Sequence, residues 1–269
     1  MSRKLDLSIV IPAYKESAKI ERDIRAAAGF LRENGILGEI IVVDDGSPDE
    51  TAERAAALCE EYPNLTVLAY RPNRGKGHAV RHGVLRAQGG IVMFADSGLC
   101  VPFEIAKIGI AMIDMDMCDI ANGSRRMRGS VVVAQPFYRR AGSRVFKLFI
   151  HAFMGLPLSI LDTQCGFKLY RREVAQALFA DAFTDGFMFD TEIIMRALRA
   201  GYRILEFPVL WSNDADSRFH PVKHTARLAR DLIVMRYRLS PFGRHSIKPR
   251  QPIEERVFQG SPEASPSGA

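Results

Sequence analysis

Polar side chains follow three of the first four apolar segments of the sequence, at the point where each segment ends. The first segment ends in "PAYKE" (12–16), the second in Asp44 and Asp45, and the fourth in Asp96. A buried strand needs no carboxylate at its end, and helix capping accounts for one such acid better than for three. The pattern therefore favours ligand binding.

The residue types limit the kind of ligand. The phosphate loop G-x-x-x-x-G-K-[ST] is absent, and Gly75-Lys76-Gly77 lacks the rest of a dinucleotide fingerprint. Carboxylates can accept hydrogen bonds from a base or a ribose, or hold a divalent cation that bridges a diphosphate. Lys76, Arg125 and Arg126 could supply positive charge to such a diphosphate.

The segments that must position these residues alternate between strand and helix patterns. Continuous apolar runs predict buried strands at 5–14, 39–45, 65–70 and 91–96, and apolar residues at helical spacing predict helices at 16–35, 47–63 and 76–90. Such alternation is typical of a parallel sheet with helices on both faces, in which ligands bind beyond the carboxyl ends of the strands.

Local signals predict further element boundaries. Ser47 and Glu50, with Pro48 between them, predict a capping box at the start of the second helix. Later patterns predict helices at 103–113, 172–182, 190–201 and 224–239 and extended segments at 119–125, 166–172 and 202–211. Proline, serine, glycine and charged residues dominate 240–269, which predicts a disordered tail.

The composition is that of a soluble globular protein. The 269 residues are 47% hydrophobic and 25% charged, with no signal-peptide pattern and no apolar run of about 18 residues. Four cysteines lack metal-site spacing, which favours a cytosolic protein with free thiols. The net charge of +6 is unevenly distributed along the sequence. Residues 217–250 include nine Lys or Arg and one acidic residue, and residues 124–147 include seven Lys or Arg and no acidic residue. Each basic run is either a solvated face or a surface for an anionic partner.

Four motifs occur in order, "IVIPAYKES", "VVDDGSPDET", "NRGKGHAVRHGVLRAQG" and "DTQCGFKLYRR", together with "GFMFDTEII". They resemble the family 2 glycosyltransferases of the GT-A fold. The resemblance is greatest to the polyprenyl-phosphate sugar transferases, which transfer glucose or mannose to dolichyl phosphate. The resemblance covers Leu7 to Leu239. It implies one α/β domain over 1–239, with a Rossmann-like, mostly parallel sheet flanked by helices. A nucleotide-sugar half at 5–123 would precede an acceptor half at 124–239.

The resemblance also implies roles for individual residues. The nucleotide sugar would be bound by Pro12, Tyr14, Glu16, Asp44, Asp45, Asn73, Arg74, Gly75, Lys76, Asp96 and Ser97. The catalytic residues would be Asp96, Arg125 and Asp162, with Asp96 also the ligand of a Mg²⁺ or Mn²⁺ ion. The acceptor phosphate would lie against Arg139, Arg140, Arg144, Gln164 and Arg218.

One residue departs from the family pattern. The family usually has D-x-D at the end of the fourth strand, whereas this chain has Asp96-Ser97-Gly98. A single carboxylate can still hold Mg²⁺ together with diphosphate oxygens and water. We expect weaker metal binding, with the metal recruited together with the substrate, and retained catalysis because the other motifs are complete.

The implied reaction moves a hexose from UDP-glucose, or alternatively GDP-mannose, to a polyprenyl or dolichyl phosphate with inversion at the anomeric carbon. The acceptor phosphate is ionised near neutral pH, so it needs positioning more than a general base. Asp162, Asp190 and Glu192 are the acids that would orient it or a sugar hydroxyl. If the helix predicted at 190–201 begins after Asp190 in the motif "FDTE", this residue is instead the N-cap of that helix.

Two segments could bring the protein to a lipid acceptor. The apolar run 146–158 fits a membrane interface or a core helix, and the basic helix 223–238 fits anionic lipid or packing on the sheet. We therefore expect a peripheral protein at the cytoplasmic face of a membrane. Homo-oligomers and a membrane partner protein stay open.

Other functions are also open. Gly98 suggests a nucleotide-sugar-binding protein with weakened or lost catalysis, and the variable acceptor side allows a soluble or glycan acceptor. The pI near 9.2 suggests nucleic-acid binding. However, the basic runs lack interleaved aromatic residues, and the sequence contains no recognised RNA-binding or DNA-binding motif. We therefore expect no nucleic-acid partner.

Overall fold

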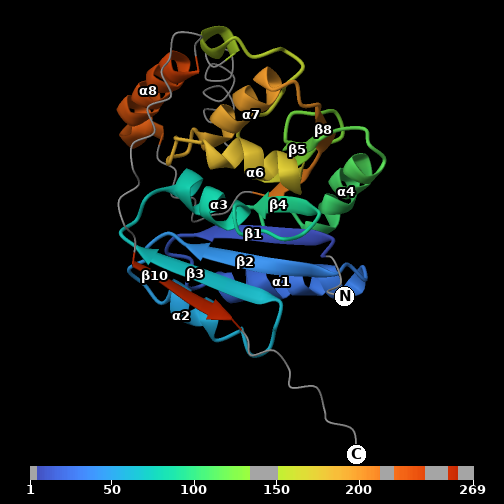
Figure 1. Ribbon diagram of the computed structural model, residues 1–269, viewed down its shortest axis with the longest axis vertical. Helices are drawn as coiled ribbons and strands as arrows, with labels where there is room; N and C mark the ends of the chain where they lie inside the picture. The colour runs from blue at the N-terminus through green and yellow to red at the C-terminus, as the bar shows by residue number, and fades with distance from the viewer. Residues whose placement is uncertain (1–4, 134–150, 213–220, 240–253, 260–269) are drawn as a thin grey trace, which may run out of the picture.

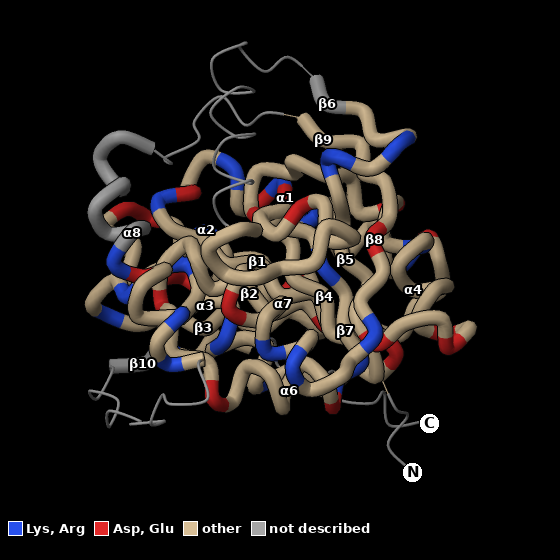
Figure 2. The backbone as a smooth tube through the Cα atoms, turned by 90° about the horizontal axis from the view of Figure 1, so that it is seen from above, with Lys and Arg blue, Asp and Glu red and all other residues tan. Residues whose placement is uncertain are grey.

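The computed structural model describes residues 5–133, 151–212, 221–239 and 254–259. Within these residues, eight strands form one sheet in the order β10-β3-β2-β1-β4-β7-β5-β8, and helices cover both of its faces (Figure 1). Seen from above, the sheet runs from β10 and β3 on the left to β5 and β8 on the right (Figure 2). This is the single-domain, mostly parallel α/β fold that the sequence predicts.

The first four strands are parallel and rich in apolar residues. They are β1 (Leu7–Ala13), β2 (Gly38–Asp44), β3 (Leu65–Arg71) and β4 (Ile91–Ala95). In β1, Ile9 and Ile11 lie in one core cluster and Val10 in another, because successive side chains point to opposite faces. Both faces are covered, and the four predicted buried strands are confirmed.

The remaining strands of the sheet include one that reverses direction. β7 (Phe167–Arg171) lies antiparallel between β4 and β5 (Ile120–Ser124), and β8 (Ile204–Pro208) runs parallel to β5. β6 (Val131–Val133) and β9 (Leu210–Ser212) form a separate pair. Because β7 is antiparallel, Phe167 lies opposite Ala95. The "DTQCG" segment therefore meets the carboxyl end of β4.

Helices form a layer on each face of the sheet. One layer holds α1 (Ile20–Glu33), α2 (Thr51–Ala56) and α4 (Ala106–Asp114), the last preceded by a 3-10 turn at Phe103–Ile105. The other holds α3 (Lys76–Val84), α6 (Arg172–Ala180) and α7 (Phe189–Arg199). α1 and α2 thus lie below the sheet in Figure 1, and α3 and α6 above it.

A third core cluster lies outside the second layer, next to α7. α8 (Pro221–Arg238) contributes Leu232 and Met235 to it, and α7 contributes Ile194 and Met195. α8 therefore packs on α7 and not on the sheet, contrary to one of the two alternatives for this helix. This position puts α8 at the upper edge of the molecule in Figure 1.

The apolar run 146–158 is described from residue 151 onward. Met154 and Leu156 are buried in the cluster with α7 and α8, as the core-helix alternative predicts, whereas Leu158 is exposed. Within the described parts of the chain, no helix combines the length and the apolar character needed to cross a membrane.

Two predictions about element ends are wrong. α2 begins at Thr51 without a side-chain cap, because Ser47 Oγ accepts a hydrogen bond from the Lys15 backbone N–H instead. Part of the predicted disordered tail forms β10 (Glu254–Gln259), which pairs antiparallel with β3. β3 would otherwise present unpaired backbone groups at the sheet edge, so pairing with β10 satisfies them.

Candidate active site

Hydrogen bonds join the carboxyl ends of β1 and β2. Lys15 N–H donates to Ser47 Oγ at 2.8 Å, and Asp45 N–H donates to the Ala13 carbonyl at 2.8 Å. Asp44 Oδ2 accepts the Ser47 N–H at 3.1 Å, while its buried Oδ1 has no hydrogen bond to any described residue. Burial raises the pKa of Asp44, although its hydrogen bonds with Ser47 oppose this. Asp44 is therefore a buried acceptor that suits a donor group of a ligand.

Asp45 organises the loop that follows β3. Its Oδ1 accepts hydrogen bonds from the Tyr70 hydroxyl and the Arg74 N–H, each at 2.8 Å. Its Oδ2 accepts them from the Asn73 side-chain amide and the Gly75 N–H, also at 2.8 Å. Asp45 thus holds residues 73–75 in place, a positioning role that sequence reasoning did not identify.

Two glycines let the start of α3 approach the segment before α7. Gly75 has φ +108, and a Cβ on it would lie 2.5 Å from the carbonyl oxygen of Asp185. A Cβ on Gly77 would lie 2.4 Å from the carbonyl oxygen of Thr184. Larger residues would push α3 away from this segment. The G-K-G motif is explained by close backbone packing, and it fixes the position from which the Lys76 side chain extends.

Asp96 lies where β4 ends and β7 begins. Its N–H donates to the Gly166 carbonyl at 2.9 Å, and a Cβ on Gly166 would lie only 2.0 Å from Asp96 Oδ2. The Asp96 carboxylate therefore fills the space that a side chain at position 166 would need. Lys76 Nζ lies 2.6 Å from Asp96 Oδ1. The structure thus brings together two residues that the sequence predicted for one site.

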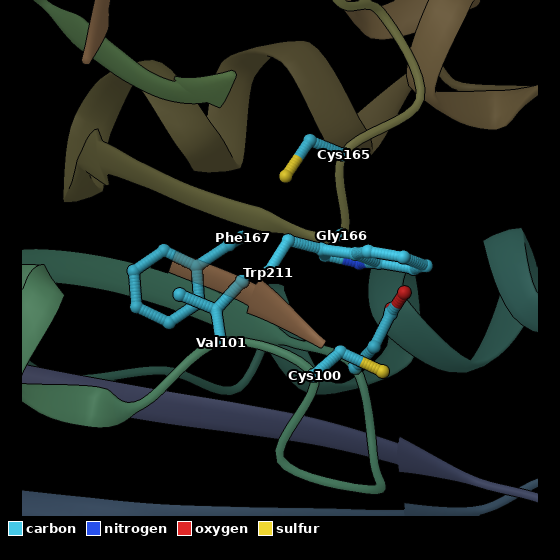
Figure 3. A pocket seen from close by; sticks show the side chains of 7 residues that line it. Cys100, Val101, Cys165, Gly166, Phe167 and Trp211 are labelled. Atoms are coloured by element: carbon cyan, nitrogen blue, oxygen red, sulfur yellow. The ribbon is translucent and has the colours of Figure 1, made fainter. Parts of the chain in front are cut away.

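A small hollow opens beside Asp96. Its walls include Asp96, Cys100, Val101, Cys165, Gly166, Phe167 and Trp211 (Figure 3). Cys100 and Cys165 lie on opposite sides of the Trp211 ring in this view. Burial raises the pKa of Cys165 to about 12, so its thiol is protonated at neutral pH. The hollow is consequently walled by apolar and neutral groups around a single carboxylate.

The residues after Asp96 pass through two left-handed backbone positions, Gly98 with φ +96 and Leu99 with φ +50. Gly98 N–H donates to Asp23 Oδ2 at 2.6 Å, and Asp23 is an α1 residue that is 1% exposed. Glycine adopts such a φ without strain. The turn therefore puts a backbone amide, held by Asp23, at the position where the family pattern has its second acid.

Arg125 and Asp162 form one ion pair. Arg125 Nε donates to Asp162 Oδ2 at 2.7 Å, and Nη2 donates to Oδ1 at 2.9 Å. Burial alone would raise the pKa of Asp162, but the Arg125 charge and hydrogen bonds hold it well below its usual value. Such a carboxylate is a poor proton acceptor. Asp162 is therefore suited to orient Arg125, whose guanidinium lies 5.7 Å from the centre of the Trp211 ring.

Glu206 of β8 is a residue of this region that sequence reasoning missed. Its Oε1 accepts hydrogen bonds from the backbone N–H groups of Leu161 and Asp162 at 3.0 and 2.9 Å, and from the Asn122 side-chain amide at 3.1 Å. Glu206 therefore supports the loop that carries Asp162. The sequence signal was a single acid within the apolar run "ILEFPV".

Two side-chain contacts join the start of α7 to β7 and to the segment before it. Gln164 Nε2 donates to Thr191 Oγ1 at 2.9 Å. Asp190 Oδ1 lies 2.6 Å from Nζ of Lys168, which is 0% exposed and also donates to the Cys165 carbonyl. α7 begins at Phe189, so the alternative in which the helix begins after Asp190 and this residue is the N-cap is wrong. Asp190 instead neutralises the lysine that holds the "DTQCG" segment.

Glu192 has a structural role within the second helical layer. It is buried in α7, accepts the Thr184 N–H at 2.7 Å and pairs with Arg196 Nε at 2.7 Å. It therefore fixes the segment that packs against Gly75 and Gly77, and its hydrogen bonds leave it poorly suited to orient an acceptor.

The other predicted site residues fall into two groups. Pro12 is buried in β1, and Tyr14, Glu16 and Ser97 lie on the segments that follow β1 and β4; the Glu16 N–H donates to Thr51 Oγ1 at 2.9 Å. The predicted acceptor-phosphate arginines, Arg139, Arg140, Arg144 and Arg218, lie outside the described residues. Their assignment stays a prediction.

The donor set at Asp96 fits a divalent cation only in combination with a ligand. Across the described ranges, no three carboxylate, histidine or cysteine side chains gather as a metal site. Asp96 offers one carboxylate, and Lys76 contacts it. Mg²⁺ is commonly bound through one or two carboxylates together with substrate phosphates. A metal at Asp96 would therefore need the oxygens of a bound diphosphate.

Comparison with known proteins gives consistent results. A sequence model described as Glycosyl transferase family 2 matches residues 8–179. A dolichyl-phosphate beta-glucosyltransferase of Saccharomyces cerevisiae is 33% identical over 248 residues, which cover 86% of this chain and 74% of that protein. A human protein of the same name is 31% identical over 244 residues, covering 86% and 75%.

Solved structures share the fold. Glucosyl-3-phosphoglycerate synthase of Mycobacterium tuberculosis, in complex with Mn²⁺, UDP-glucose and phosphoglyceric acid, superposes with a TM-score of 0.62 at 21% identity. The match covers 86% of this chain and 78% of that one. At this identity the likeness establishes the common architecture.

Proposed function

The chain belongs to glycosyl transferase family 2 and is a glycosyltransferase, and on this premise we propose that it transfers glucose from UDP-glucose to a polyprenyl phosphate such as dolichyl phosphate. The names of the yeast and human relatives support both the sugar and the acceptor. The "GKGHAV" and "DTQCGFK" segments, which resemble the glucosyl branch, support the same choice over GDP-mannose.

The observation that carries the proposal is that Lys76 and Arg125 both lie beside the hollow at Asp96. Lys76 contacts Asp96 at 2.6 Å, and the Arg125 guanidinium lies 5.7 Å from the centre of the Trp211 ring, which lines the same hollow as Asp96. Two cations in fixed positions suit the negative charge that grows on a leaving diphosphate. The buried Oδ1 of Asp44, at the end of β2, suits a hydrogen-bond donor of the base or ribose.

The chain's own residues divide the work of binding and transfer. Lys76 and Arg125 would bind and orient the diphosphate, and Asp162 would hold the Arg125 guanidinium in its orientation. Asp96 would hold a Mg²⁺ or Mn²⁺ ion together with the diphosphate oxygens, and such an ion supplies further positive charge to the leaving group. The acceptor phosphate would attack the anomeric carbon from the opposite face, with Gln164, Arg139, Arg140 and Arg218 as the residues that position it.

Membrane contact forms part of the proposal, with the cytoplasmic face as the expected side. The described part of α8 carries the basic residues Arg230 and Arg236 beside Ile233 and Tyr237, which are 62% and 64% exposed. Basic residues next to exposed apolar side chains suit an anionic interface. A lipid-linked acceptor would be met at such a surface.

The direct test is a transfer assay with radiolabelled UDP-glucose or GDP-mannose, a short polyprenyl phosphate and Mg²⁺ or Mn²⁺. We expect label from UDP-glucose in the lipid fraction. Asp96→Asn should lower the rate by about 100-fold or more, the scale seen when a group that stabilises transition-state charge is lost. Asp114→Asn, at an exposed acid at the end of α4, is the matched control and should leave the rate unchanged.

The outcomes separate the candidate functions. Binding of UDP-glucose without transfer to any acceptor would favour a nucleotide-sugar-binding protein, the function that Gly98 suggests. Label from GDP-mannose alone would reassign the sugar. An unchanged rate in Asp96→Asn would remove Asp96 from the reaction.

A further inference from the structure

Lys76 and Asp96 form a close ion pair. Their charged atoms lie 2.6 Å apart, and the two side chains are only 21% and 33% exposed. Lys76 also lies near the ring of Phe189, at 5.8 Å from its centre, and within the field of the Asp190 carboxylate. The Lys76 ammonium is thus the cation that occupies the contact position on Asp96.

The rest of the Asp96 turn offers no second carboxylate to an incoming cation. Gly98 replaces the second acid of the family pattern, and its N–H is used by the buried Asp23. Asp23 itself accepts hydrogen bonds from Arg22 through Oδ1. A divalent cation that approached Asp96 alone would therefore have to displace Lys76 and would gain a single carboxylate in return.

We propose that Lys76 is the resident counter-cation of Asp96, and that a divalent cation binds this carboxylate only when a nucleoside diphosphate draws the ammonium away. The inference rests on the proposed function and deepens it. Two cations compete for one carboxylate when both are near it, because each is repelled by the other. A diphosphate carries several negative charges, so it can take over the Lys76 contact and supply oxygens to the metal at the same time.

The exchange predicts reciprocal binding. If a nucleoside diphosphate raises the affinity for the metal, the metal must raise the affinity for the diphosphate by the same factor. Lys76 lies at the centre of this coupling, because its release from Asp96 and its contact with the diphosphate are the same movement. Removing its charge should therefore strengthen binding of the metal alone and weaken binding of the diphosphate alone.

The test measures Mn²⁺ binding by the loss of the free-ion electron paramagnetic resonance signal, with and without UDP, and UDP binding by calorimetry with and without Mn²⁺. For the wild-type protein we expect Mn²⁺ alone to bind weakly, and each ligand to strengthen the other by the same factor, on the order of 10-fold to 100-fold. This comparison needs no variant, so it stands even if a substituted protein folds poorly.

Variants at Lys76 then identify the residue responsible. Lys76→Met should increase the affinity for Mn²⁺ alone by about tenfold, which corresponds to about 1.4 kcal/mol, and should decrease the affinity for UDP in the absence of metal. Lys76→Arg keeps the charge and should behave like the wild type towards Mn²⁺. Lys107→Met, at an exposed lysine of α4, is the control for a change in net charge.

The possible failures are distinct. Tight binding of Mn²⁺ alone to the wild type, or an unchanged affinity for Mn²⁺ alone in Lys76→Met, would overturn the role of Lys76 and leave the proposed function intact. Absence of UDP binding under every condition would instead overturn the proposed function itself.

Discussion

At the scale of single residues, the contact between Asp96 and Gly166 is the tightest constraint on the site. The Asp96 carboxylate lies where a Cβ on residue 166 would be, and the backbones of the two residues are hydrogen-bonded. The glycine of "DTQCGFK" therefore serves to admit the carboxylate of another motif.

Gly166→Ala tests this contact. The added methyl group would lie 2.0 Å from Asp96 Oδ2, so the carboxylate must leave its place beside Lys76. We expect the rate of sugar transfer to fall by about 100-fold, as for loss of Asp96 itself, with the far-ultraviolet circular dichroism spectrum retained.

The matched control is Gly29→Ala, in α1, where an added Cβ would meet only Glu33 Oε1 at 3.8 Å. Alanine in a helix is favoured over glycine by about 1 kcal/mol, so this variant should be more stable and fully active. Retained activity in Gly166→Ala would show that the Asp96 position tolerates displacement.

Sequence reasoning could locate residues of the site that end strands, because their position and polarity are both visible in the sequence. The structure confirms that Asp44, Asp45 and Asp96 lie at or just beyond the ends of β2 and β4, whereas their binding roles stay predictions. Asp23 and Glu206 were missed, because each acts through a backbone N–H that is distant in sequence. The Arg125–Asp162 pair was also hidden, since nothing in either motif indicates that the two side chains bind each other.

At the scale of elements, strands were predicted more reliably than helix starts. β1 and β4 are buried on both faces, so continuous apolar runs mark them clearly. The start of α2 was wrong because the Ser47 side chain contacts the β1 end and not its own helix. β10 was missed because a short strand of mixed polarity is stable only against the edge of β3.

Two neighbouring residues of β10 test whether this strand contributes to stability. Phe258 packs against the core cluster below the sheet, whereas Val257 is 53% exposed. We expect Phe258→Ala to lower the free energy of unfolding by about 2 kcal/mol, less than a fully buried phenylalanine would lose. Val257→Ala should change it by less than about 0.5 kcal/mol. Urea unfolding curves measure both, and equal effects would contradict the pairing of β10 with β3.

At the scale of the whole molecule, α8 has a buried inner face and an exposed outer face of different composition. Its inner residues belong to the cluster with α7, and its outer face joins arginines to exposed apolar side chains. α4, which carries another exposed isoleucine, lies on the other side of the molecule (Figure 1). A membrane contact through α8 would therefore leave α4 in solvent.

Flotation with vesicles of phosphatidylcholine and phosphatidylserine tests this orientation. Ile233→Glu should reduce the bound fraction at equilibrium, with an affinity loss of about tenfold or more, because burial of an isoleucine contributes about 1.5–3 kcal/mol. Ile108→Glu, on α4, introduces the same charge and should bind as the wild type does. Equal losses in both variants would indicate a general charge effect and contradict the assignment to α8.

The placement of β7 between β4 and β5 has a consequence for how this enzyme could be re-engineered. β7 comes from the later part of the chain, yet it is hydrogen-bonded on both sides to strands from the earlier part. A chimera that joined residues up to 123 to the remainder of another relative would take β7 from that relative. The strand that pairs with β4, which Asp96 follows, would then come from a different protein. To change the acceptor preference, surface segments of a relative should therefore be grafted onto this protein. All strands of the sheet should then come from one and the same protein.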